Sequence, residues 1–285
     1  MQREMIRMIN RRIRNFSRHA RPAMVPFALL AMWATNGAYP GLAQPSAQPT
    51  FKSTAEASQT LFQAVQSNNE EAIAKILGGS TELTSSRDAD KDKVERELFV
   101  QKYQEMHRLG RDADGSVTLY IGVENWPFPV PLVATNGAWR FDRDAGMREV
   151  MFRRIGDNEL TAIATCHQFV AAERRYRTDP KTAEPADISV ASLVAKAATG
   201  SAAADPVLLH GYYFRILSMG GTDLKKTGGF ALIAYPAEYR SSGVMTFVVM
   251  ANDVVYEKDL GANTSSLASA MTAFRKDATW HIGDE

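Results

Sequence analysis

The sequence predicts an α+β fold, with N-terminal helices and an antiparallel sheet followed by a C-terminal antiparallel β-meander with a terminal helix. Three observations predict this class. Apolar residues recur at helical spacing up to residue 109, and they alternate with other residues from residue 117. The last third of the chain then holds four short apolar runs separated by turn residues.

Three helices are predicted first. Thr54 is a suitable N-cap, and Ala57, Leu61 and Val65 follow it at i, i+4 and i+8 spacing. A second helix spans residues 70–77, with acidic residues at its start and a glycine after its end. A third runs over residues 92–109, and Gly110 ends it. Its predicted buried face consists of Val94, Leu98, Phe99, Tyr103 and Met106.

Strands are predicted next because the apolar period changes to two. Val117, Leu119, Ile121 and Val123 alternate with smaller or more polar residues. The Asn136-Gly137 pair predicts a tight hairpin between residues 130–134 and 138–141. Prolines at every second position of residues 126–131 remove donors from one side of a strand, which suits a protected sheet edge. A polyproline ligand for a partner is the alternative.

The second half is predicted to begin with two helices, over residues 145–155 and 158–177, with Asp157 as N-cap of the second. Four strands follow at 212–217, 230–235, 244–250 and 254–257. Ser265 or Ser266 then caps a terminal helix whose Leu267, Met271 and Phe274 lie at i, i+4 and i+7. This helix is expected to cover one face of the meander.

Residues 1–43 have the pattern of a secretion signal. Seven arginines precede a short apolar run, and Gly41 and Ala43 supply the small residues that a signal peptidase needs. The run is shorter than the roughly 20 residues of a membrane span, although an uncleaved anchor stays an alternative. The predicted organisation is a signal peptide (1–43), a flexible leader (44–53), an N-terminal α+β domain (54–177), a connector (178–206) and a C-terminal domain (207–285). The protein is therefore expected in the periplasm or outside the cell.

Removal of the signal changes the charge of the 285-residue chain. It leaves 26 of the 33 basic and 31 of the 32 acidic residues, so the net charge of the mature protein is near −5. An acidic chain has no electrostatic reason to bind nucleic acid or anionic lipid. No membrane span is predicted after cleavage. Cys166 is the only cysteine, which excludes an intramolecular disulfide.

Several segments resemble a family of bacterial exported proteins known as domain of unknown function 2950. They are WPFPVPLV (126–133), GAWRFD (137–142), RRIGDNEL (153–160), GYYFRI (211–216), GGFALIAYPAEY (228–239), GVMTFVV (243–249) and VYEKDLG (255–261). The sequence departs from such proteins around residues 178–188, where they carry a longer polar insertion, and in a shortened loop at 222–227. The resemblance implies export and an α+β architecture, and it implies no activity.

No catalytic set, cofactor or metal site is predicted. Cys166 and His167 are neighbours on a helix, so their side chains diverge by about 100° and cannot form a nucleophile–base pair with each other. The mature histidines have no zinc-motif spacing. Asp112 and Asp114 resemble the start of a calcium loop without its later ligands, and a hairpin turn explains them better.

The predicted binding residues are aromatic. Trp126, Tyr213 and Tyr239 are candidates for a surface that contacts a partner. The function expected from the sequence is that of an exported, non-catalytic protein that binds a protein or surface partner in the cell envelope. The alternative is a small-ligand-binding protein or hydrolase, with a pocket between helices and sheet lined by His107, His167 or His210.

Overall fold

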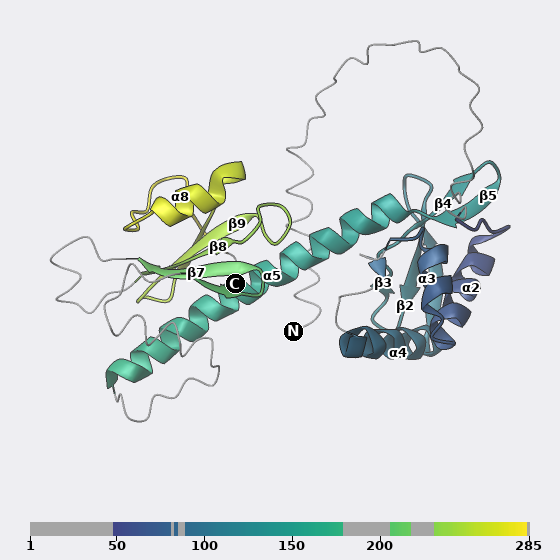
Figure 1. The fold of residues 1–285 in the computed structure, drawn as a ribbon, viewed down its shortest axis with the longest axis horizontal. Coiled ribbons are helices and arrows are strands. Elements are labelled where there is room, and N and C mark those ends of the chain that lie inside the picture. Colours follow the sequence, from purple (N-terminus) through teal and green to yellow (C-terminus); the bar gives the residue numbers. More distant parts are fainter. Residues whose placement is uncertain (1–47, 81–82, 85–88, 179–205, 218–230, 284–285) are drawn as a thin grey trace, which may run out of the picture. The chain divides into compact units, whose positions relative to one another are not determined.

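The computed structural model describes residues 48–80, 83–84, 89–178, 206–217 and 231–283 (Figure 1). The predicted signal peptide, nearly all of the predicted connector and the loop at 222–227 lie outside these residues. The chain divides into two compact units, one ending at Val150 and the other beginning at Met151. No helix among the described residues is both long enough and apolar enough to cross a membrane.

Unit 1 combines helices with a five-stranded antiparallel sheet, as the fold class predicts. The sheet order is β1-β2-β4-β5, and β3 also pairs with β2. The elements are α2 (Thr54–Gln66), α3 (Glu70–Ile76), α4 (Ala89–Glu105), β1 (His107–Arg111), β2 (Val117–Ile121), β3 (Trp126–Pro127), β4 (Leu132–Thr135) and β5 (Ala138–Phe141).

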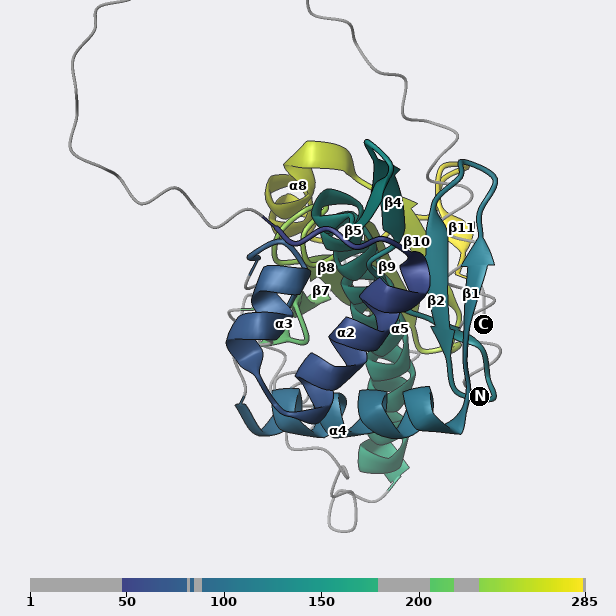
Figure 2. The same cartoon turned by 90° about the vertical axis from the view of Figure 1, so that its right-hand side faces the viewer.

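The helices of unit 1 pack on one face of this sheet. Leu61 of α2 and Ile73 of α3 share a buried cluster with Val117, Leu132 and Phe141 of the strands. Ala57 and Val65 are buried as predicted. Figure 2 shows α4 crossing α2 at a steep angle. The crossing is filled by a second, smaller cluster of Phe62, Tyr103, Leu119 and Ile121.

Side-chain hydrogen bonds fix the segment before α2 and the N-terminal ends of α2 and α3. Ser53, one residue before the predicted cap, is the N-cap of α2, and its hydroxyl accepts from the backbone nitrogen of Glu56. Asn69 caps α3 in the same way. Before α2, Gln48 donates to the carbonyls of Ile76 (2.9 Å) and Phe141 (2.8 Å), which ties the incoming chain to both layers.

The predicted third helix is wrong in its end and in its buried face. α4 ends at Glu105, and residues 107–111 form strand β1. Val94 and Leu98 are 62% and 49% exposed, whereas Tyr103 is buried. Five residues of an α-helix turn through about 140° beyond a full turn. Leu98 and Tyr103 are five residues apart, so one side of the helix cannot bury both.

Both predicted turns of unit 1 are confirmed. Asn136 and Gly137 have φ of 52° and 77°, which is the backbone of a tight hairpin turn between β4 and β5. The β1–β2 hairpin turns at residues 112–116, where the Gly115 nitrogen donates to the Asp112 carbonyl. The Pro127 segment pairs with β2, with Trp126 opposite Ile121.

Helix α5 (Arg143–Thr178) replaces the two helices predicted around Asp157. The side chain of Asp142 accepts from the nitrogens of Asp144 and Ala145 and caps the helix start. Within the helix, the Asp157 carbonyl accepts from the Thr161 hydroxyl. The predicted break failed because Gly156 costs only about 1 kcal/mol in a helix interior, which packing on either side can outweigh.

Unit 2 is an antiparallel meander, as predicted, in the order β11-β10-β9-β8-β7-β6. Its strands are β6 (Val207–Leu209), β7 (Tyr212–Leu217), β8 (Ala231–Pro236), β9 (Met245–Met250), β10 (Val255–Asp259) and β11 (His281–Ile282). A short 3₁₀ turn, η2 (Gly261–Asn263), leads into α8 (Thr264–Ala270).

Both faces of this second sheet are covered. On one face, Cys166, Phe169 and Val170 of α5 pack against Phe214 and Phe247. The other face packs against α8 and the segment after it, through a cluster of Leu217, Ile233, Tyr235, Val248, Tyr256, Ala268 and Trp280. Figure 1 shows α5 and α8 on opposite sides of β7–β9.

The predicted terminal helix is shorter than its apolar spacing suggests. α8 begins after Asn263 and stops at Ala270, and Met271 is extended. Met271 and Phe274 still pack against the sheet, as predicted, but from the non-helical segment after α8. Leu267, predicted to join them, is 50% exposed.

Candidate functional site

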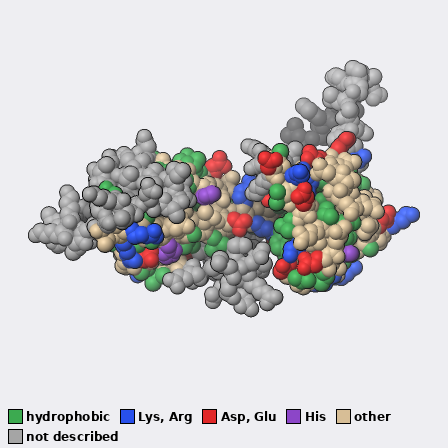
Figure 3. Space-filling view, turned by 90° about the horizontal axis from the view of Figure 1, so that it is seen from below, with side chains coloured by type: hydrophobic (Ala, Val, Ile, Leu, Met, Phe, Trp, Pro, Cys, Tyr) green, Lys and Arg blue, Asp and Glu red, His purple; other side chains and the backbone are tan. Residues whose placement is uncertain are grey.

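The large exposed apolar side chains of unit 1 gather on two neighbouring elements. Val94 and Leu98 lie on α4, and Val123 (61% exposed) and Trp126 (37% exposed) lie on or beside the β2–β3 turn. We call these four residues the α4–turn surface. Figure 3 shows hydrophobic side chains at the surface of unit 1, at the right, with carboxylates among them. Large apolar side chains exposed on two adjoining elements make this region the candidate contact surface of unit 1.

Backbone hydrogen bonds join the two elements. The nitrogen of Gly122 lies 3.0 Å from the carbonyl of Lys102 and 2.8 Å from that of Met106, so the turn closes the C-terminal end of α4. Gly122 has a φ of 70°, and a Cβ there would lie 2.7 Å from the Lys102 side chain. The close approach and the positive φ both require glycine at this position.

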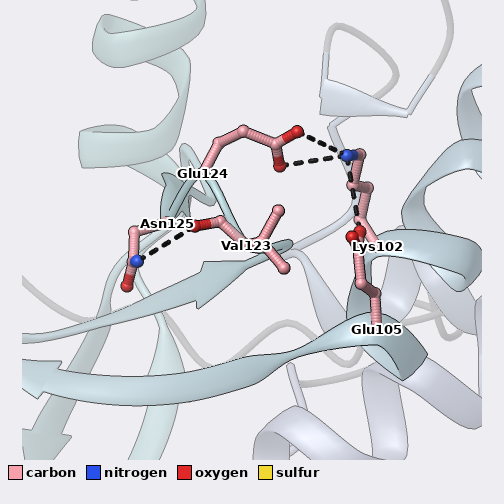
Figure 4. A network of polar contacts seen from close by, with 5 residues as sticks. All are labelled: Lys102, Glu105, Val123, Glu124 and Asn125. Carbon is pink, nitrogen blue, oxygen red and sulfur yellow. Dashed lines mark hydrogen bonds and ion pairs between the residues drawn. The ribbon is translucent and has the colours of Figure 1, made fainter.

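Lys102 forms the polar centre of this region, as Figure 4 shows. Its ammonium lies 2.8 Å from Glu124 of the turn and 3.4 Å from Glu105 of its own helix. The hydrogen bond to Glu124 raises the pKa of Lys102, and the negative charge of Glu105 adds to this rise. Two carboxylates thus share one ammonium, and the cluster keeps a negative charge.

The adjoining residues of the turn are held by Arg108. Its Nε donates to Asn125 Oδ1 over 2.5 Å, and its guanidinium lies 4.0 Å from the centre of the Tyr120 ring. Asn125 has a φ of 55°, a backbone conformation that asparagine tolerates better than most residues. The turn that carries Val123 is therefore fixed from both the helix and the sheet.

A column of stacked rings begins in the core of unit 1, on the side of α4 that faces away from Val94 and Leu98. Phe62 stacks on Tyr103 with a centroid distance of 4.5 Å, and Tyr103 stacks on His107 at 3.9 Å. The Tyr103 hydroxyl is hydrogen-bonded to Ser58, and His107 Nδ1 lies 3.0 Å from the Tyr103 carbonyl. His107 and Trp126 both pair with Ile121, from opposite sides of β2. Two of the predicted site residues therefore belong to one row of the sheet.

The other four predicted residues lie in unit 2. His167 Nδ1 is 2.8 Å from Asp253 Oδ1, a contact between α5 and the β9–β10 turn. His210 occupies the first position of a tight β6–β7 turn, with a φ of 46°, and Gly211 follows at 78°. His210 is exposed and His167 is half-buried, and each sits at a connection between elements.

The two tyrosines lie in different surroundings. Tyr213 is half-buried against Tyr235, on the face of the sheet that α8 covers. The Tyr239 hydroxyl donates to Asp259 Oδ2 over 3.1 Å, and burial is the main reason that its pKa is raised. Neither tyrosine belongs to the α4–turn surface.

Cys166 is fully buried under the sheet of unit 2. Burial raises the pKa of its thiol to about 12, and the negative charge of Asp253 contributes. At neutral pH the group is a protonated thiol, which is neither a good nucleophile nor a metal ligand.

The two aspartates of the calcium-like motif serve the β1–β2 turn. Asp112 Oδ2 accepts from Thr118 (2.7 Å), and Asp114 Oδ1 accepts from the hydroxyl and the nitrogen of Ser116. The Ser116 hydroxyl is the main reason that the pKa of Asp114 is lowered. Among the described residues, no three His, Cys, Asp or Glu side chains are grouped to hold a metal ion.

The exposed Val94 and Leu98 were missed as candidate site residues. Their signal was present in the sequence, because they lie on one side of α4 while Phe99 and Tyr103 lie about 140° away. When a helix has apolar residues on two well-separated sides, only one side packs on the core of the protein, and the other is left to contact another molecule.

The model of a family described as "Protein of unknown function (DUF2950)" matches residues 48–187 and 180–282. No curated protein and no solved structure matches the chain.

Proposed function

The chain belongs to the DUF2950 family of proteins of unknown function, and from that premise we propose that it is an exported, non-catalytic protein that binds a protein partner through the α4–turn surface. The observation that carries the proposal is the exposure of Val94, Leu98, Val123 and Trp126 on two elements held together by hydrogen bonds. Tryptophan is among the residues that most often dominate binding at protein interfaces.

Export is supported by the sequence of residues 1–43. We expect cleavage after Ala43, so N-terminal sequencing of the protein recovered from the cell envelope or medium should begin at Gln44. An envelope protein that keeps Met1 would contradict cleavage and favour the uncleaved anchor, whereas a chain that stays with the cytoplasmic fraction would contradict export and leave the binding proposal to be judged separately.

The non-catalytic part of the proposal is supported by the positions of the reactive groups. Cys166 is buried and protonated, so its thiol is not available as a nucleophile for the neighbouring His167. His210 serves a hairpin turn. The alternative of a pocket lined by histidines gains no support from these positions.

Site-specific photocrosslinking in cells tests the binding surface. A photoreactive amino acid is placed at Leu98 and, as a matched control, at Leu267 of unit 2, since these side chains are 49% and 50% exposed. We expect a discrete crosslinked product from position 98 and none from position 267. Equal products from both positions, or none from position 98, would contradict binding at this surface.

A further inference from the structure

We propose that strand β1 is the contact strand of a symmetric dimer. The β1 strands of two copies pair antiparallel, with Leu109 of each copy at the two-fold axis, and join the two sheets of unit 1 into one. This inference goes beyond the proposed function, because β1 is not part of the α4–turn surface. Three features carry it: an open edge of β1, arginine side chains that lie away from that edge, and a sequence that pairs with itself without opposing like charges.

The outer edge of β1 is open in unit 1. Within the described part of the chain, β2 is the only strand that pairs with β1. Figure 2 shows α4 and the other strands of this sheet on one side of β1. An edge strand of this kind presents backbone N–H and C=O groups to another strand.

Two backbone hydrogen bonds establish which groups of β1 point outward. At one end of the strand the Asp112 nitrogen donates to the Ser116 carbonyl over 2.9 Å, and at the other end the Met106 carbonyl accepts from Gly122 over 2.8 Å. The backbone groups of an antiparallel strand alternate in direction from one residue to the next. The even-numbered residues of β1 therefore face β2. The residues that direct their N–H and C=O groups outward are His107, Leu109 and Arg111.

This edge has little protection against another strand. β1 contains no proline, and its register with β2 runs over five residue pairs without a bulge. Both arginines of β1 lie against rings of their own sheet. The Arg108 guanidinium is 4.0 Å from the centre of the Tyr120 ring, and that of Arg111 is 5.7 Å from the centre of the Trp139 ring. These rings belong to β2 and β5, on the inner side of β1, so the arginine side chains are directed away from the open edge.

The sequence of β1 pairs with a second copy of itself in one register best. With Leu109 at the axis, all three outward residues pair, because His107 lies opposite Arg111 of the second copy. Arg108 then lies opposite Gly110, which has no side chain. An axis at Arg108 or at Arg111 would place two guanidinium groups opposite each other, which is destabilising. An axis at Gly110 would pair only Leu109 and Arg111 within the strand.

The charged residues at the two ends of β1 also fit this register. Glu105 precedes the strand and Asp112 follows it. Continued beyond the strand, the register places Glu105 opposite Ala113 of the second copy and Asp112 opposite Met106. Each carboxylate therefore lies opposite an uncharged residue, and no pair in the register opposes two charges of the same sign.

Sedimentation equilibrium of the mature protein tests the dimer, and residue-resolved hydrogen exchange locates its interface. We expect a dimer in which the outward amides of Leu109 and Arg111 become protected as the protein concentration rises. The amides of Arg108 and Gly110 face β2 and should be protected at every concentration. A protein that stays monomeric, or a dimer whose outward amides exchange as in the monomer, would overturn the pairing.

Two substitutions of Arg111 separate its backbone from its side chain. Arg111→Pro removes one outward N–H from each copy and should raise the dimer Kd about tenfold or more. Arg111→Ala removes the same exposed side chain, keeps the N–H and should stay dimeric. Protection of the Gly110 amide in both variants serves as the control that β1 still pairs with β2. Equal dissociation constants for the two variants would contradict pairing through the backbone.

The charge at residue 107 gives a test that does not depend on proline. His107→Lys places a like charge opposite Arg111 twice in the dimer and should raise the Kd several-fold, whereas His107→Glu places an opposite charge there and should lower it. Both variants lose the stack on Tyr103, so the comparison between them isolates the charge. The mature protein is acidic, so overall repulsion between copies would give the reverse order. That reverse order, or equal effects, would overturn the register.

Hydrogen exchange also distinguishes the second copy from a strand of another protein. An extended segment of a partner can add to a sheet edge through the same backbone groups. If an envelope protein protects the Leu109 and Arg111 amides while this protein remains monomeric, the occupant is a strand of that protein, and the symmetric dimer is overturned.

Discussion

Glu159 Oε1 lies 3.0 Å from the backbone nitrogen of Val244, 85 residues later in the chain. The same oxygen lies 3.0 Å from the nitrogen of Met245, at the start of β9. The preceding residue, Asn158, donates to the carbonyl of Ser242 over 2.8 Å. Two consecutive side chains of α5 thus hold the chain on both sides of Gly243. Three of the segments that carry the family resemblance meet here, around residues 158–159, 211–212 and 243–245.

Replacing Glu159 should lower the stability of unit 2, and the loss should be larger when the new side chain has no oxygen to accept the two hydrogen bonds. Glu159 is only 4% exposed, so Glu159→Ala leaves two N–H groups without their acceptor and should cost about 2–4 kcal/mol. Glu159→Gln keeps one carbonyl oxygen that can accept both bonds and should cost about half as much. Hydrogen exchange of β9 amides measures the effect within unit 2. Glu238→Gln, at an exposed position, is the control, and equal losses for the Ala and Gln variants would contradict the assigned contacts.

Gly243 should not tolerate a side chain. A Cβ there would lie 2.1 Å from the Tyr212 hydroxyl oxygen, and that hydroxyl donates to the Met245 carbonyl over 2.9 Å. Gly243→Ala is therefore expected to lower the free energy of unfolding by about 1–3 kcal/mol. Adding Tyr212→Phe removes the nearest atom and should recover part of this loss. Gly283→Ala, where the nearest atom is 3.6 Å away, is the control in urea denaturation; equal stability of all variants would show that the loop adjusts freely.

Arg215 should determine the stability of α8. Its Nη2 atom donates to the carbonyls of Ala268 (2.7 Å), Ser269 (3.3 Å) and Met271 (2.6 Å), where the helix ends. A cation at this end satisfies unpaired carbonyls and complements the helix dipole. Arg215→Met should speed hydrogen exchange in α8 several-fold more than in β9. Arg240→Met, at an exposed position of the same unit, should not, and uniform acceleration by Arg215→Met would argue for global destabilisation instead.

The Cys166 thiol should react only when unit 2 opens. Labelling of the native protein is expected to be slow and to accelerate with urea. Because burial raises the folded pKa to about 12, the folded state favours the protonated thiol. The corresponding stabilisation is fully present below the unfolded pKa of about 8.5 and is lost as the pH rises toward 12. Cys166→Ala should therefore show a smaller loss of stability between pH 8 and pH 10. Fast labelling without urea would contradict the buried position.

Strands β2, β4, β5 and β7 to β10 were predicted because their signals are local, whereas the short strands β1, β3, β6 and β11 were not predicted. Val117, Leu119 and Ile121 alternate and are all buried, and Asn136-Gly137 alone determines its turn. The β6–β7 turn was missed because His210 is not a usual turn residue, although Gly211 after it was available as a cue. Turns of this kind are set by a few residues, so a short stretch of sequence is enough to recognise them.

Helix ends were predicted poorly because distant groups decide them. Met106 continues the helical apolar spacing, yet α4 stops at Glu105, where Gly122 of the turn donates to the carbonyl of Lys102 in the last helical turn and to that of Met106 just after it. Met271 continues the apolar spacing of α8, yet the helix ends before it, where Arg215 donates hydrogen bonds to the carbonyls of Ala268 and Met271. At Gly156 a helix end was predicted, but α5 continues without a break, because packing on either side outweighs the cost of the glycine. None of these partners is near in sequence.

The candidate site was predicted only in part for a related reason. Trp126 and His107 were recognised by residue type, and pairing with Ile121 brings them to one row. Leu98 was assigned to the core by its apolarity alone. Tertiary contacts establish which side of α4 faces inward, such as that of Tyr103 with Phe62 and that of Phe99 with Phe128.

The stack of His107 on Tyr103 has a spectroscopic consequence. A ring 3.9 Å below the imidazole, nearly parallel to it at 12°, lies where its circulating π electrons shield the imidazole protons. The His107 Hε1 resonance should therefore appear upfield of those of the other histidines. β2 places His107 in the same row as Trp126. This single proton resonance can therefore report the binding of a partner at the α4–turn surface, and it does so without any change to the side chains of that surface.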